Sequence, residues 1–204
     1  MSSTSVNKVS IWLGSGGHTF SKEVEGTDDS VWADMRRCAE VEVVVDTHKT
    51  ALVPEAYVDG DNLSRHLGDL ALRVASDESV VCSRPVGGIV AVMAVSSDAV
   101  AILKRVTKGV AFTSPLLVGE PLERGTLFEL SSDTLYVRVY DGGLRFAEAL
   151  RVESDGDILF VFETLHRAYG MYNMYARAKG DTDRIARLTK GCFKSITLCQ
   201  GGEV

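Results

Sequence analysis

The sequence lacks a long apolar run. Its longest apolar stretch covers residues 88–95 and ends at Ser96, whereas a membrane-spanning helix needs about 20 such residues. The N-terminus, from Met1 to Lys8, also lacks the basic start and apolar core of a secretory signal. These two absences predict a cytoplasmic protein with no membrane insertion.

Cysteine and histidine are both scarce. The four cysteines have no CxxC spacing and no histidine nearby, and no two histidines have the i, i+4 spacing of common zinc sites. We therefore expect no metal ion and four free thiols, most of them buried. The GxSxG pattern of a nucleophile elbow and the GxxxxGK[ST] pattern of a P-loop are also missing. The sequence thus predicts no catalytic residue and no cofactor.

Basic residues are too few for a nucleic-acid-binding protein. The chain has 22 lysines and arginines against 28 aspartates and glutamates, a formal net charge of -6, whereas phosphate backbones select a basic face. Hydrophobic residues make up 45% and charged residues 25% of the 204 residues, which is typical of globular proteins. A chain of this length can bury roughly 70% of its unfolded surface, so it needs no disulfide or metal to fold.

Apolar residues recur along the chain at strand and helix spacing. In the first half, strands are expected at 8–13, 18–24, 40–46, 51–53, 79–82, 88–95 and 110–118. Helices are expected from Asp28 to Cys38, over 63–74 and after Ser97, which would cap the third helix. The first two strands would form a hairpin around the glycines at 14, 16 and 17.

The second half repeats the plan of strands followed by alternating helices and strands. Strands are expected at 126–130, 134–140, 144–152, 172–178 and 195–198, and helices from Asp155 to Tyr169 and over 183–189. Asp155 and Asp157 are expected as helix caps, and the basic cluster Arg177, Lys179, Arg184, Arg187 and Lys190 as a solvated helix face. Two such layouts point to mixed sheets flanked by helices.

The segment 171–175 combines methionine and tyrosine. As a strand, it would place Met171, Asn173 and Tyr175 on one face and Tyr172 and Met174 on the other. This composition fits a core strand under helices, and it also fits an adaptable contact surface.

The repeated layout resembles the actin-like ATPase fold with its ribonuclease-H-like lobes. The stretch from Thr134 to Phe146 looks like the second-lobe hairpin of PilM-type pilus-assembly proteins. The early hairpin, Leu52-Val53-Pro54-Glu55 and the unit from Gly156 to Gly180 are similar to an uncharacterised Bacteroidetes family of small actin-like proteins. The resemblance implies an α/β fold with lobes at 1–120 and 121–204 and without large inserted subdomains.

The resemblance also implies where a nucleotide would bind. An actin-like ATPase holds phosphates between two hairpin turns, each supplied with an aspartate followed by a glycine. The first turn here, Gly14-Ser15-Gly16-Gly17, keeps the glycines without the aspartate. In the second lobe, Glu129 stands in as a carboxylate, and Gly180 is a single glycine where the nucleoside end needs a pair. These six residues are the candidate nucleotide-binding positions, and ordinary turns are the alternative reading of the glycines.

Three functions are compatible with this pattern. The leading hypothesis is a non-catalytic scaffold or protein-binding module, a pseudo-ATPase with an unknown protein partner or a second copy of itself as partner. The alternative is a minimal nucleotide-binding protein or ATPase that uses the cleft between the lobes. A ribonuclease-H-like nuclease comes last, because it needs clustered carboxylates for two metals and the expected strands carry mainly valine, leucine and alanine.

Overall fold

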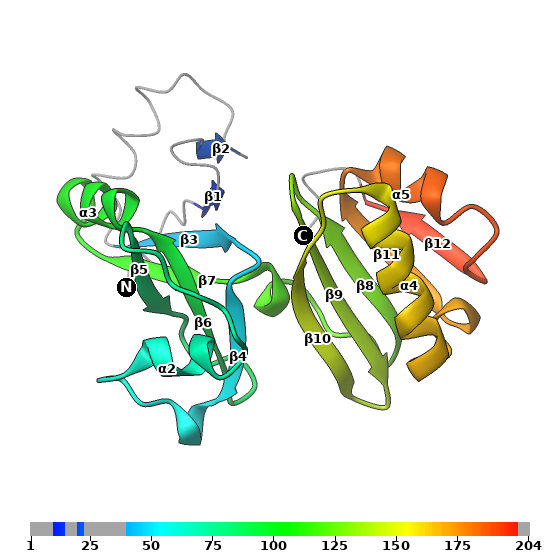
Figure 1. Cartoon of the computed structure of the whole chain (residues 1–204), viewed down its shortest axis with the longest axis horizontal. Coiled ribbons are helices and arrows are strands. Elements are labelled where there is room, and N and C mark those ends of the chain that lie inside the picture. The colour runs from blue at the N-terminus through cyan, green and yellow to red at the C-terminus, as the bar shows by residue number, and fades with distance from the viewer. Residues whose placement is uncertain (1–9, 15–19, 23–39, 200–204) are drawn as a thin grey trace, which may run out of the picture. The chain divides into compact units, whose positions relative to one another are not determined.

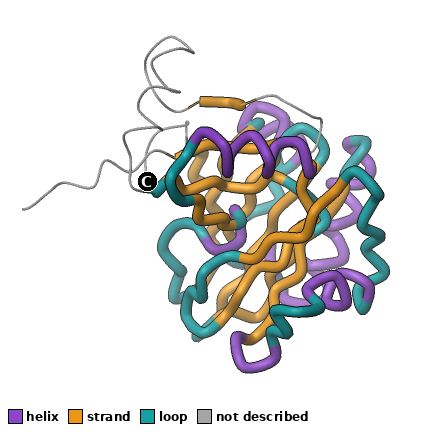
Figure 2. The backbone as a smooth tube through the Cα atoms, turned by 90° about the vertical axis from the view of Figure 1, so that its left-hand side faces the viewer, coloured by secondary structure: helices purple, strands orange, loops and turns teal. Residues whose placement is uncertain are grey.

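The computed structural model describes residues 10–14, 20–22 and 40–199, and the chain divides into two units, Met1–Leu117 and Val118–Val204. Figure 1 labels the elements, and Figure 2 shows how strands and helices alternate along the chain. Each unit has its own sheet and its own buried core. Within the described ranges, no helix is long and apolar enough to cross a membrane.

The main sheet of the first unit has four strands in the order β2-β1-β3-β7. They are β1 (Ser10–Gly14), β2 (Phe20–Lys22), β3 (Val41–Asp46) and β7 (Val110–Thr113). Strands β1 and β2 pair antiparallel, which confirms the predicted hairpin, whereas β1–β3 and β3–β7 are parallel pairs. Val41, Val43 and Val45 share a core with Leu103 of α3 (Ser97–Val106). The helix predicted from Asp28 to Cys38 lies outside the described residues.

Between β3 and β7 the chain forms a second, three-stranded antiparallel sheet in the order β4-β6-β5. Its elements are β4 (Thr50–Pro54), η1 (Glu55–Tyr57), α2 (Leu63–Gly68), β5 (Glu78–Cys82) and β6 (Ile89–Ser96). Leu67 of α2 is fully buried in the core of this sheet. The sequence pattern predicted these strands, but it did not indicate that they leave the main sheet.

Two predicted helix boundaries in the first unit are wrong. The apolar spacing predicts one helix over 63–74, but α2 ends at Gly68, and Ala71 has a left-handed φ of 58°. The Leu72 N–H donates to the Leu67 carbonyl at 2.9 Å, so the chain turns there and Leu72 reaches the core from a loop. The cap of α3 is Ser96, whose Oγ accepts from the backbone N–H three residues on, instead of Ser97.

The second unit is a five-stranded sheet in the order β10-β9-β8-β11-β12. Its elements are β8 (Arg124–Leu130), β9 (Thr134–Asp141), β10 (Leu144–Arg151), α4 (Asp155–Tyr169), η3 (Met171–Asn173), β11 (Tyr175–Gly180), α5 (Thr182–Leu188) and β12 (Ser195–Leu198). The short turn η2 (Pro115–Leu117) ends the first unit. Strands β8, β9 and β10 form the predicted antiparallel meander, and β11 is parallel to both β8 and β12.

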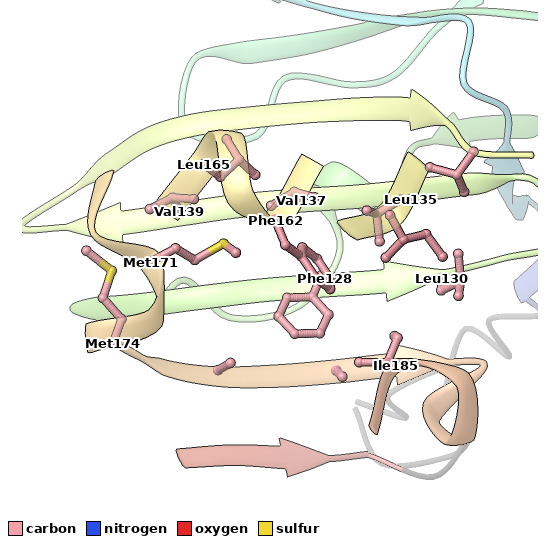
Figure 3. Packing of buried hydrophobic residues seen from close by; sticks show 14 residues of the cluster. Phe128, Leu130, Leu135, Val137, Val139, Phe162, Leu165, Met171, Met174 and Ile185 are labelled. Atoms are coloured by element: carbon pink, nitrogen blue, oxygen red, sulfur yellow. The ribbon is translucent and has the colours of Figure 1, made fainter. Parts of the chain in front are cut away.

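The core of the second unit lies between the sheet and its two helices. Phe128 of β8 packs against Phe162 of α4 with ring centroids 5.2 Å apart, and Ile185 of α5 is fully buried in the same cluster. Figure 3 shows these residues gathered on one face of the sheet. Both helices therefore cover the same face, as two successive right-handed crossovers in one direction require.

The strand predicted at 172–178 begins three residues late. Residues 171–173 form the 3₁₀ turn η3, so the expected alternation does not hold there. Met171 and Met174 are both buried in the core, whereas Tyr175 is 58% exposed. The burial of the two methionines therefore agrees with the prediction that this segment belongs to the core.

The free thiols are more exposed than the sequence predicts. Cys82 is exposed, and Cys192 and Cys199 are partly exposed. Cys38 lies outside the described residues.

A Gly180→Ala substitution is expected to lower the free energy of unfolding by at least about 3 kcal/mol. Gly180 has a φ of +79°, and a Cβ there would lie 2.0 Å from the carbonyl oxygen of Leu130, so the two strands would have to separate. Gly142→Ala is the matched control, because its φ is +66° but no atom lies within 4 Å. It should cost only about 1–2 kcal/mol. Urea denaturation measures both, and equal losses would contradict the backbone contact.

A Thr126→Val substitution is expected to leave stability unchanged or to raise it by up to about 1 kcal/mol. Thr126 is fully buried, and its Oγ1 has no hydrogen-bond partner in the described part of the chain. Thr134 is equally buried, but its Oγ1 donates to Asp133 at 3.2 Å, so Thr134→Val should lose about 1 kcal/mol. Thermal unfolding compares the two variants, and a larger loss at Thr126 than at Thr134 would refute the assignment.

Candidate functional site: the carboxyl ends of the parallel strands

Parallel strands offer binding positions at their carboxyl ends, where the loops that follow them meet. In the first unit, β1 ends at Gly14 and β3 ends at Asp46, and these two residues are register partners. Asp46 is only 9% exposed. The structure thus places a largely buried carboxylate beside the end of β1. Of the four predicted residues in the first turn, Gly14 belongs to β1, and Ser15, Gly16 and Gly17 lie outside the described residues.

The turn that follows Asp46 is held by its own side chains. The Thr50 hydroxyl donates to the Thr47 carbonyl at 2.8 Å, and the Lys49 N–H donates to Thr47 Oγ1 at 3.1 Å. Both threonines are buried. This network fixes the backbone directly after the carboxylate.

An ion pair braces the same turn against β5. The Lys49 ammonium donates to both carboxylate oxygens of Glu78, at 2.8 and 2.7 Å, and both side chains are about four-fifths buried. Burial opposes ionisation of Glu78, but hydrogen bonds from the Ala75 N–H and from Lys49 outweigh it. The pKa of this carboxyl therefore lies below its ordinary value.

In the second unit, the parallel pairing of β8 and β11 brings two predicted residues together. Glu129 is the register partner of Lys179, and Leu130 is the register partner of Gly180. Glu129 points away from the helices, because its neighbours Phe128 and Leu130 lie in the core. Glu129 and Gly180 therefore lie on neighbouring strands at the carboxyl end of this sheet.

Three backbone donors at this end of the sheet form hydrogen bonds within the protein. The Ser131 N–H donates to the Thr134 carbonyl, and the Asp181 N–H donates to the Leu130 carbonyl, both at 2.9 Å. The Arg184 N–H donates to Asp181 Oδ1 at 3.1 Å, so a carboxylate caps the first turn of α5.

Asp155 joins the first turns of α4 and α5. Arg184 Nε lies 2.7 Å from one carboxylate oxygen of Asp155, and Arg187 Nη2 lies 2.9 Å from the other. Hydrogen bonds from these two arginines lower the pKa of Asp155. Asp155 lies in the first turn of α4, as predicted, but the residue that caps the helix is Ser154. The prediction of a solvated face is wrong at Arg184, because this side chain pairs with Asp155 and is mostly buried.

The predicted cap at Asp157 is confirmed. Its carboxylate accepts from the N–H groups of Glu153 and Ser154, and the Ser154 hydroxyl accepts from the Asp157 N–H, which makes a capping box. The N–H bonds from Glu153 and Ser154 and the Ser154 hydroxyl lower the pKa of Asp157.

The sequence reasoning missed Asp46. The sequence feature that could have identified Asp46 is its position: it is an acidic residue directly after the apolar run Val43-Val44-Val45, at the end of a buried strand. A single carboxylate there can orient one cation or water, but across the described ranges no group of three His, Cys, Asp or Glu side chains could hold a metal ion.

The fold matches solved structures, although no family model and no curated protein matches the sequence. One is a Bacteroides thetaiotaomicron protein with an actin-like ATPase fold and unknown function, at 9% identity and a TM-score of 0.66 over 94% of this chain and 90% of that chain. The cytoplasmic domain of EpsL, an inner membrane component of the Vibrio cholerae type II secretion system, matches at 14% identity and a TM-score of 0.48 over 96% of this chain and 87% of that chain. The chain has the predicted α/β, actin-like ATPase fold.

Stability is expected to depend on pH through Glu78. Its pKa is lowered in the folded state, so its contribution is complete above the unfolded pKa and is lost as the pH falls through the folded pKa. Glu78→Gln should cost about 1–2 kcal/mol at pH 7, and the difference from the wild type should shrink between about pH 5 and pH 3. Urea denaturation across this range measures it. Glu120→Gln, at an exposed position, should have no effect, and a constant penalty for Glu78→Gln at every pH would contradict the assignment.

Proposed function

We propose that this chain is a non-catalytic, degenerate actin-like protein, a pseudo-ATPase that acts in the cytoplasm as a scaffold or protein-binding module. Its lobes are residues 1–120 and 121–204, and its partner is another protein or a second copy of the chain. The observation that carries this proposal is that three N–H groups at the carboxyl end of the second-unit sheet, those of Ser131, Asp181 and Arg184, donate to oxygens of the protein itself.

A phosphate bound there would need free N–H groups and a favourable helix end. The N–H groups of Ser131, Asp181 and Arg184 all donate to protein oxygens instead. The oxygen that accepts from Arg184 belongs to the Asp181 carboxylate, which would repel an approaching phosphate. Moving Asp181 away would also uncap α5. Phosphate binding would therefore have to replace several contacts that hold the fold together.

Asp46 is the observation that favours the alternative, a minimal nucleotide-binding protein or ATPase. It is a largely buried carboxylate in register with Gly14 at the end of β1. A carboxylate at this position can orient magnesium-bound water near a phosphate. In that case replacing Asp46 or Glu129 would lower nucleotide binding.

Magnesium and ATP are expected to leave the protein unchanged. Calorimetry should give a Kd above about 1 mM, and the melting temperature should not shift with ATP, because a ligand stabilises only a state that it binds.

Tighter binding that is lost in both Asp46→Asn and Glu129→Gln would overturn the proposal in favour of the alternative. Ser132→Ala, at an exposed turn position, is the control variant in the same experiment. ATP hydrolysis abolished by Glu129→Gln but not by Ser132→Ala would have the same meaning.

A further inference from the structure

Within the described part of the second unit, α4 and α5 both cover one face of the sheet, and the other face carries no helix of this unit. Ala176 and Ala178 of β11 lie in the core under α4 and α5, so Tyr175, Arg177 and Lys179 point to the other face. The register partners of Tyr175 and Arg177 on β12 are Ser195 and Thr197. Tyr175, Arg177, Ser195 and Thr197 are all exposed.

An aromatic ring and two cations stand out on this face. Tyr175 is 58% exposed, and the Lys194 ammonium lies 5.1 Å from the centre of its ring. Arg177, two residues further along β11, is also exposed. We call Tyr175, Arg177, Lys194, Ser195 and Thr197 the β11–β12 face.

The positive charge of the β11–β12 face is not neutralised locally. Within the described part of the chain, neither Arg177 nor Lys194 forms an ion pair with a carboxylate. The register partner of Arg177 on β8 is the apolar Leu127, and Glu129 instead partners Lys179. A basic, aromatic surface on a protein with a net charge of -6 is selective for an acidic ligand.

The five residues of the β11–β12 face are all exposed. The chain that enters the second unit is held over β9, where Arg138 Nη1 donates to the Val118 carbonyl at 2.8 Å. Strand β12 is the outermost strand of the sheet. A partner that approaches from the outer edge of the sheet therefore reaches this face, and no described element has to move.

We propose that the β11–β12 face docks an acidic segment of a partner protein. The inference rests on the proposed protein-binding function and names the chemistry of the partner. Carboxylates of the partner pair with Arg177 and Lys194, and its apolar or aromatic side chains lie on the Tyr175 ring. A protein segment fits better than a nucleic acid, because the face has two unpaired cations and one ring instead of a long basic stripe.

Fluorescence anisotropy with a labelled oligo-glutamate peptide tests the proposal at low salt. Binding is expected in the micromolar range, and Arg177→Glu with Lys194→Glu should weaken it by about tenfold or more. Lys104→Glu with Arg105→Glu is the matched control, because it makes the same charge change at two exposed positions of α3. Added salt should weaken the binding.

Four results would overturn the proposal, three from the binding experiment and one from the chemical shifts. The first is no binding of the peptide, and the second is an equal loss in the test and control variants, which would indicate a general charge effect. The third is tighter binding of an oligothymidylate of equal length, which would indicate a nucleic-acid surface. Amide chemical-shift changes should centre on residues 175–179 and 194–197 of the wild-type chain, and changes elsewhere would also contradict it.

This experiment and the ATP experiment fail independently. ATP binding lost in Asp46→Asn would refute the non-catalytic function, and it would leave the peptide result at the β11–β12 face intact. Conversely, a chain that binds neither ATP nor peptide would keep its non-catalytic assignment and lose this docking site.

Discussion

The close approach of β11 to β8 at Gly180 is the constraint on which the second unit depends. Only a residue without a Cβ allows the Leu130 carbonyl to come so near, and this approach lets the Asp181 N–H bond that same carbonyl. Asp181 then caps α5, and α5 presents Arg184 to Asp155 at the start of α4. One backbone contact thus sets the position of both helices over the sheet.

The same contacts bear on function, because they use the groups that a phosphate would need. In the first unit the arrangement differs. Asp46 ends β3 as a buried carboxylate, and the turn after it is fixed by Thr47 and Thr50 and braced by the Lys49–Glu78 pair. The two units therefore share a fold plan but support opposite expectations about nucleotide binding. This contrast is why the decisive variants lie at Asp46 and Glu129, one in each unit.

The strands and most helices follow from the sequence, because alternating apolar residues and local caps such as Asp157 are local signals. The predictions that were wrong concern features that depend on contacts between residues far apart in the sequence. Helix α2 ends early because Leu72 reaches the core from a turn at Leu67, which periodicity does not encode. The pairing of Asp155 with Arg184 joins residues 29 positions apart. Asp46 went unnoticed because its partner in register, Gly14, lies on another strand.

Glu129 and Gly180 lie on the paired strands β8 and β11, but a residue at such a position can have a purely structural role. Gly180 is required by the backbone of β8 whether or not a nucleotide binds. A glycine at this position is therefore no evidence for or against nucleotide binding. On the β11–β12 face, Arg177 and Lys194 form no ion pair within the described part of the chain, and the Lys194 ammonium lies over the Tyr175 ring. The exposed charge of the β11–β12 face is therefore a stronger indication of a binding surface in the second unit than Gly180 is.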